Sequence, residues 1–141
     1  MTTADRAATP SPPVTRSALA LFAQGRRALF EAYQASSSAE RFRLAHLAAL
    51  RAAAAVSARA IPPPGSRRQL QSVWSLVASA APDLATWAAY FAAGAADRAA
   101  VEAGATSAVS HGDADDQLRA ADAFLDIVEA TLMPAWPALA S

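Results

Sequence analysis

The chain has 141 residues, of which 54% are hydrophobic. It contains no cysteine, and its formal net charge is zero. Its length predicts a single domain with ample apolar sequence for a core. The absence of cysteine excludes disulfides, thiol catalysis and cysteine metal sites. No uninterrupted apolar run is long enough for a membrane span, and the first residues lack the apolar segment of a signal peptide. We therefore expect a cytoplasmic protein.

The charges are distributed unevenly along the chain. Residues 1–68 hold ten arginines against three acidic residues, a net charge of +7, and residues 69–141 hold two arginines against nine acidic residues, a net charge of −7. Such asymmetry favours a nucleic-acid partner or self-association, or else basic and acidic helices that pair within one bundle. All basic residues are arginine, and lysine and asparagine are absent. Because lysine and asparagine have AT-rich codons, we infer a high-GC genome and expect an actinobacterial source.

The N-terminal part of the chain predicts a tail followed by a helix. Residues 1–14 are rich in threonine, alanine, proline and serine and have no apolar period, which predicts a disordered tail. The folded part is expected over residues 15–133, with a C-terminal tail over 134–141. The first helix is predicted over 15–35, because Leu19, Phe22, Arg26, Leu29 and Tyr33 recur at steps of three and four residues.

The second predicted helix, over residues 37–60, is apolar on nearly all sides. Ser37 and Glu40 have the spacing of a capping box, which marks its start. A helix that is apolar on every side must be covered on every side, and one small bundle covers only part of such a surface. We therefore predict that this helix is central in the bundle and that the protein is a homodimer.

Prolines and glycines mark the predicted helix boundaries in the next part of the chain. Prolines at 62–64 end the second helix, and a short third helix over 67–80 is predicted to be capped by Ser66. Pro82 suits the first turn of a fourth helix, which Gly104 ends. Gly94 lies on the apolar stripe of that helix, where it is predicted to permit close approach of another backbone. Arg98 on the same stripe is predicted to pair with an acidic residue, since an unpaired buried guanidinium is costly.

A fifth helix is predicted from Ser110, with Asp113 three residues later, to Pro134. Its predicted inner face carries five apolar residues: Leu118, Ala121, Leu125, Val128 and Leu132. No strand pattern occurs in the sequence. The fold class that follows is all-α, an up-and-down bundle of four to five helices.

Motifs for catalysis and cofactors are scarce. The only histidines are His46 and His111, and neither lies in a pattern of metal ligands. Glycine-rich phosphate loops are absent. Asp113, Asp115 and Asp116 crowd the start of the fifth helix, but they lack the ligand spacing of an EF-hand. We predict no metal site and no cofactor.

The stretch from Glu40 to Val56, together with the later WAAYFAAGAADRAAVEAG and the acidic final helix, resembles HEPN domains, the higher-eukaryote and prokaryote nucleotide-binding domains, and in particular a small actinobacterial branch. The resemblance spans residues 17–132. It implies a homodimeric helical bundle that binds or acts on RNA. Active HEPN ribonucleases use an arginine and a histidine four to six residues apart and need no metal. The matching residues here are Arg41 and His46.

Three roles stay open for His46: a core or interface residue, an RNA contact, or a catalyst. The polar residue that usually follows the arginine in active members is Phe42 here. Residues five apart on a regular helix also point about 140° from each other. Arg43, three residues from His46, is its nearer neighbour on the helix surface. These observations favour a protein without efficient ribonuclease activity.

Arginines of the N-terminal half are the candidate RNA contacts, namely Arg41, Arg43, Arg59, Arg67 and Arg68, because arginine can hold phosphates. Three functions follow. The first is a non-catalytic module associated with RNA, and the second is an adaptor for protein–protein interactions. The third is a weak metal-independent ribonuclease that uses Arg41 and His46.

Overall fold

The computed structural model describes residues 14–58 and 72–133. The predicted tails, the proline-rich connector and Arg59, Ser66, Arg67 and Arg68 lie outside these residues. The elements in chain order are α2 (Arg16–Gln34), α3 (Ser38–Ser57), α4 (Val73–Ala80), a 3-10 turn η2 (Pro82–Leu84), α5 (Ala85–Ala93), α6 (Ala95–Glu102) and α7 (His111–Leu132). No strand occurs among the described residues, so the predicted all-α bundle is confirmed.

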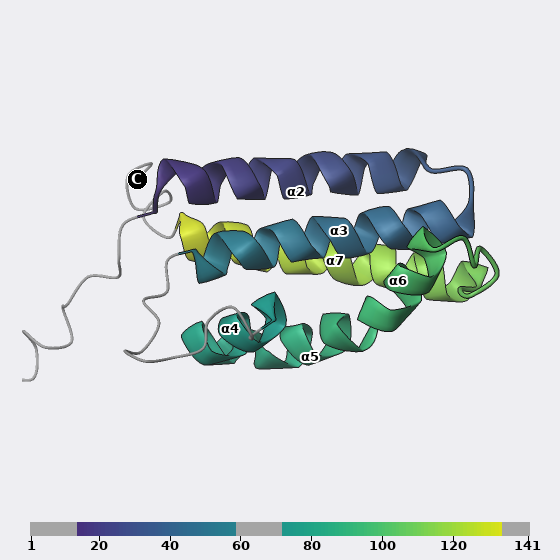
Figure 1. The fold of residues 1–141 in the computed structure, drawn as a ribbon. Coiled ribbons are helices and arrows are strands. Elements are labelled where there is room, and N and C mark those ends of the chain that lie inside the picture. The colour runs from purple at the N-terminus through teal and green to yellow at the C-terminus, as the bar shows by residue number, and fades with distance from the viewer. Residues whose placement is uncertain (1–13, 59–71, 134–141) are drawn as a thin grey trace, which may run out of the picture.

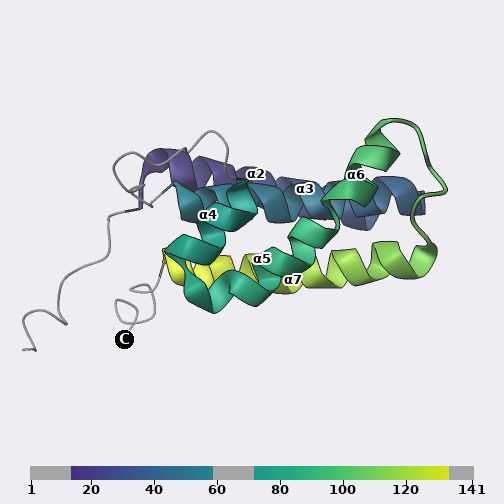
Figure 2. The same cartoon turned by 60° about the horizontal axis from the view of Figure 1, so that its bottom comes forward.

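Three long helices form one side of the molecule and short helices form the other (Figure 1). The helices α2, α3 and α7 run alongside one another, and α4 and α5 lie against α3 and α7. Seen from another side, α6 climbs from the end of α5 towards the loop that leads into α7 (Figure 2). Within the described residues, no helix is both long and apolar enough to span a bilayer.

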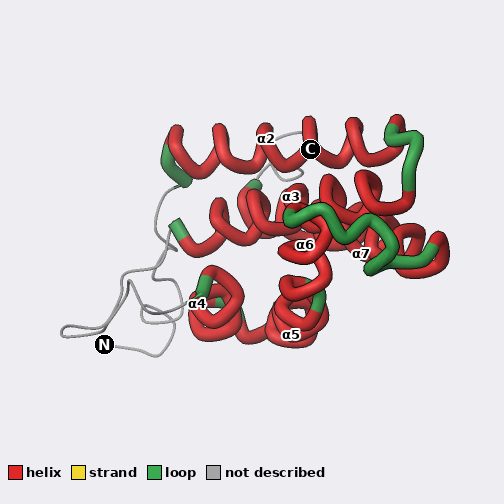
Figure 3. The backbone as a smooth tube through the Cα atoms, turned by 45° about the vertical axis from the view of Figure 1, so that its right-hand side comes forward, coloured by secondary structure: helices red, strands yellow, loops and turns green. Residues whose placement is uncertain are grey.

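The helix α3 is the centre of the bundle, as the sequence predicts, and it packs against α2, α4, α6 and α7 of its own chain. The tube drawing shows α2 on one side of it and α4 and α5 on the other (Figure 3). Its buried surface is made mostly of alanines, among them Ala45, Ala48, Ala49, Ala52 and Ala53, all at 0% exposure. Because helices of the same chain cover most of α3, a second subunit is not needed to bury the apolar surface of this helix. The argument for a homodimer from the apolar surface of α3 therefore does not hold.

The contact between α2 and α3 depends on small residues. A Cβ atom added at Gly25 would lie 3.0 Å from the backbone oxygen of Ala48, so a larger residue would push the two helices apart. At Gly94 the nearest atoms to such a Cβ are 3.5 Å away and include the side chains of Phe42 and His46. The close backbone approach predicted at Gly94 was therefore assigned to the wrong glycine.

Several predicted helix ends are confirmed, because they depend on local hydrogen bonds. Ser110 and Asp113 form a complete capping box at the start of α7. Ser37 accepts from the Glu40 amide at the start of α3, whereas the Glu40 carboxylate turns to Arg43 instead of closing the box.

Two of the predicted helices differ from the structure. Ser72, which has an extended backbone, caps α4, so the helix through Val73 does not include the predicted start at residue 67. The helix predicted from Pro82 is divided into η2, α5 and α6, with a break at Gly94. The last of these pieces, α6, ends at Glu102, and Gly104 follows with a φ of 104°. This left-handed conformation suits glycine, so the predicted stop is confirmed.

Candidate functional site

His46 lies in the centre of the bundle, at 0% exposure. The sequence places it in an alanine-rich helix, and tertiary packing surrounds it with aromatic rings. Its ring centroid lies 6.0 Å from that of Trp74, 6.3 Å from that of Phe91 and 6.4 Å from that of Phe42. Three different helices, α3, α4 and α5, therefore seal this side chain from solvent.

One nitrogen of His46 is bonded and the other is not. Nε2 donates to the backbone oxygen of Phe91 at 2.9 Å, while Nδ1 is buried and has no partner among the described residues. Burial lowers the pKa of His46, the Phe91 hydrogen bond opposes that change, and the nearby Arg98 lowers the pKa further. A neutral ring protonated on Nε2 is therefore the stable form.

Arg41 lies at the edge of the bundle and is engaged on two sides. Its Nη1 atom forms an ion pair with Asp115 at 3.2 Å, and its Nη2 atom donates to the backbone oxygen of Ala35 at 3.0 Å. The side chain is 25% exposed, in contrast to the sealed ring of His46. The structure thus does not bring the two residues together in a shared, open site.

Carboxylates already bind two of the arginines that were predicted to contact RNA, Arg41 and Arg43. Arg43 donates to both oxygens of Glu40, at 2.9 and 2.7 Å. Arg59, Arg67 and Arg68 fall outside the described residues, and their role in RNA contact stays a prediction.

The basic and acidic halves of the chain pair with each other. Arg26 on α2 contacts Asp126 at 3.0 Å and Glu129 at 2.6 Å, both on α7, and Tyr33 donates to Asp122 of the same helix. The Arg41–Asp115 pair joins α3 to α7 in the same way. Two of the six arginines described in the basic half, Arg26 and Arg41, therefore pair with carboxylates of the acidic half, which agrees in part with the interpretation that basic and acidic helices pair within one bundle.

Arg98 has the acidic partner that its position predicts. Its Nη1 atom lies 2.9 Å from Glu102, one turn further along α6, although its Nε is buried without a partner among the described residues. The pair is formed inside one helix and makes no open site.

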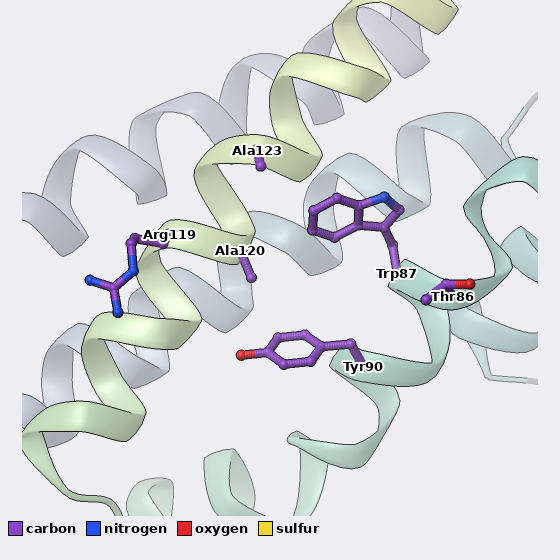
Figure 4. A pocket seen from close by; sticks show the side chains of 6 residues that line it. All are labelled: Thr86, Trp87, Tyr90, Arg119, Ala120 and Ala123. Atoms are coloured by element: carbon purple, nitrogen blue, oxygen red, sulfur yellow. The ribbon is translucent and has the colours of Figure 1, made fainter.

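An apolar cavity of about 430 Å³, which the sequence analysis did not predict, opens between α5 and α7. Figure 4 shows Trp87 and Tyr90 of α5 facing Ala120 and Ala123 of α7, with Arg119 at one end. The spacing of Trp87 and Tyr90, three residues apart, places both rings on one side of α5. That spacing is a signal in the sequence from which this surface could have been found.

A second, acidic cavity of about 300 Å³ lies next to the apolar one, and Tyr90 lines both. Its lining residues are Phe42, Tyr90, Ala93, Gly94, Asp97, Asp113, Asp116 and Gln117. Among the described residues, no three side chains of the kinds that ligate metals are grouped closely enough to hold an ion. The carboxylates therefore present a spread of negative charge instead of a compact metal centre.

Comparison with known protein families places this region in a described family. A family model described as SAV_6107-like HEPN matches residues 32–129, more than two thirds of the chain. Searches of curated proteins and of solved structures found no match. The matched region runs from the end of α2 to the end of α7, and so contains both cavities and His46.

Proposed function

Because the chain belongs to the SAV_6107-like HEPN family, we propose that it is a non-catalytic helical module that acts by binding a protein partner. Family membership accounts for the helical fold. The burial of His46 is the observation that carries the non-catalytic part of the proposal, since it separates the histidine of the predicted catalytic pair from any substrate.

A general acid or base must come within hydrogen-bond reach of the proton that it transfers. His46 is fully buried, and its Nε2 is already bonded to Phe91. Exposing the ring would require the aromatic side chains of Phe42, Trp74 and Phe91 to move apart. Arg41 is held by Asp115, so neither residue of the predicted pair is free to meet RNA phosphates.

Charge and apolar exposure together favour a protein partner. Three arginines of the basic half, Arg26, Arg41 and Arg43, are paired with carboxylates, which reduces the attraction for a polyanion. Apolar side chains are exposed instead: Phe30 on α2 is 65% exposed, and the apolar cavity opens between α5 and α7. Exposed apolar patches are characteristic of protein-binding surfaces.

Association with RNA is the second candidate. Arg16 and Arg27 on α2 have no carboxylate within 4.0 Å among the described residues, and Arg51 is bound only to the neutral Gln24. Together with Arg59, Arg67 and Arg68 these residues offer positive charge to phosphates. Since the net charge of the chain is zero, we expect such binding to be weak and to fall steeply with salt.

We also propose that the protein is a homodimer that associates through α2. Leu19, Phe30 and Tyr33 lie on one face of this helix at helical spacing, and all three are exposed. A second copy would cover this stripe.

Incubation with a structured RNA at about 50 mM salt tests the non-catalytic part of the proposal and the RNA alternative. We expect no cleavage beyond that of a buffer control, and only weak binding that falls with salt. Cleavage that disappears in His46→Gln, with the fold retained by circular dichroism, would make the protein a ribonuclease. Tight binding that is lost in an Arg67→Ser, Arg68→Ser double variant would instead place RNA association first.

A further inference from the structure

The apolar and acidic cavities form one surface with two chemical ends, because Tyr90 lines both of them. At one end Trp87, Ala120 and Ala123 offer apolar area. At the other end the carboxylates of Asp97, Asp113 and Asp116 gather around Tyr90 and Phe42. A ligand that fills both cavities must therefore be apolar at one point and positively charged at a neighbouring point.

The carboxylates of the acidic cavity are only partly neutralised. Asp116 pairs with Arg119 at 2.6 Å, and one oxygen of Asp113 accepts from the backbone amide of Ser110. Asp97 has no ion pair among the described residues. Burial, followed by the nearby charges of Asp116 and Asp113, raises the pKa of Tyr90, which agrees with a concentration of negative charge at this wall.

Gln117 supplies an independent sign of a missing ligand. This residue lines the acidic cavity, is only 3% exposed, and leaves its Nε2 group buried without a hydrogen-bond partner among the described residues. An unpaired buried amide costs free energy. A peptide carbonyl entering the cavity could accept from this amide, while a basic side chain donated to the carboxylates.

We propose that this surface binds a peptide segment of a partner protein that places an arginine or lysine side chain in the acidic cavity and an apolar side chain in the apolar cavity. The inference rests on the proposed protein-binding function and specifies the chemistry of the partner. Phosphate groups are poor occupants, because three carboxylates would repel them. A compact metal ion is a poor occupant as well, because the ligands are too dispersed.

Nuclear magnetic resonance titration of the full chain with two capped tripeptides tests the proposal. Both peptides carry leucine, and they differ only in a third residue that is arginine in one and its neutral isostere, citrulline, in the other. We expect the arginine peptide to shift the amide signals of Tyr90, Gly94 and Gln117 in a saturable way. The citrulline peptide should bind about two- to fivefold more weakly, as expected for the loss of a partly exposed ion pair.

A pair of variants with matched charge locates the effect. Asp97→Asn with Asp116→Asn removes two carboxylates of the cavity, and Glu31→Gln with Asp83→Asn removes two exposed carboxylates that do not line it. The first variant should bind the arginine peptide about as weakly as the wild type binds the citrulline peptide. The second variant should bind it as the wild type does.

Several results would overturn the proposal. Equal affinity for the two peptides, or equal weakening in both variants, would mean that the cavity does not select a positive charge. Shifts at the same amides on raising protein concentration without peptide would identify a second copy as the occupant, and shifts caused by an oligoribonucleotide would identify RNA. If the peptides do not bind and the RNA assay shows neither cleavage nor tight binding, the peptide proposal fails while the non-catalytic part of the proposed function stands, because the RNA assay tests that part separately.

Discussion

The sealed position of His46 predicts that the bundle loses stability when the pH falls below the ordinary pKa of histidine. In the unfolded chain the ring takes up a proton below about pH 6.5. In the folded chain the pKa of His46 is lowered, first by burial and then by Arg98, despite the Phe91 hydrogen bond and the favourable charge of Glu102. The unfolded state therefore binds more protons, so acidification favours it.

The size of the effect follows from proton linkage. The stability that the neutral, buried His46 ring contributes is fully present above about pH 6.5. This stability is lost progressively as the pH falls towards the lowered pKa of His46 in the folded state. If the folded state takes up no proton, the free energy of unfolding falls by about 1.4 kcal/mol between pH 7.5 and pH 5.5. For a small domain this change corresponds to a decrease of about 0.5 to 1.4 M in the urea midpoint.

Urea unfolding curves at pH 7.5, 6.5 and 5.5 measure this loss. His46→Gln keeps a nitrogen that can donate to Phe91 but does not titrate, so we expect its midpoint to change little over the same range. His111→Gln is the matched control, because His111 is exposed, and it should keep the dependence of the wild type. The reasoning fails if the wild-type midpoint is independent of pH, or if His46→Gln shows the same dependence.

Three further predictions concern the helices. Gly25→Ala should lower the free energy of unfolding by about 1–3 kcal/mol through overpacking. Gly112→Ala is the control: its Cβ would meet nothing closer than 3.8 Å, so the free energy of unfolding should stay unchanged or rise. Equal thermal melting temperatures of the two variants would contradict this prediction. Phe30→Glu should convert a dimer into the 14.5 kDa monomer in sedimentation equilibrium, and a monomeric wild type would rule out the dimer. Arg26→Gln should cost about 1 kcal/mol or less, because its partners are exposed, and the loss should shrink in high salt.

Local signals in the sequence predicted the fold well where structure depends on neighbouring residues. The capping box of Ser110 and Asp113 and the stop at Gly104 need only a few residues on either side. The start of α4 was missed because Ser66 and Ser72 both offer capping oxygens, and spacing alone does not decide between them. The break at Gly94 was also missed, since the apolar stripe on the two sides of this glycine is continuous in the sequence.

The surroundings of the candidate site are harder to predict from sequence. His46 is enclosed by Trp74 and Phe91, which lie 28 and 45 positions further along the chain, so its burial depends on how the short helices dock. The acidic cavity likewise joins Asp97 of α6 to Asp116 of α7 across the loop between them. Periodicity within one helix identifies its inner face, but it does not identify which inner faces meet.

At the alanine-rich contact surface of α3, substitutions that enlarge a side chain are expected to cost more stability than substitutions that shorten one. In most cores, shortening a side chain leaves a cavity and costs stability. Here Ala48, Ala49, Ala52 and Ala53 are already alanine and are fully buried, so a conventional alanine scan leaves them unchanged and reports nothing about this contact surface. Substitutions that enlarge these side chains are the informative ones, because a fully buried position leaves little room for an added methyl group. A scan with serine, valine and leucine would be needed to reveal how little volume this interface can accept.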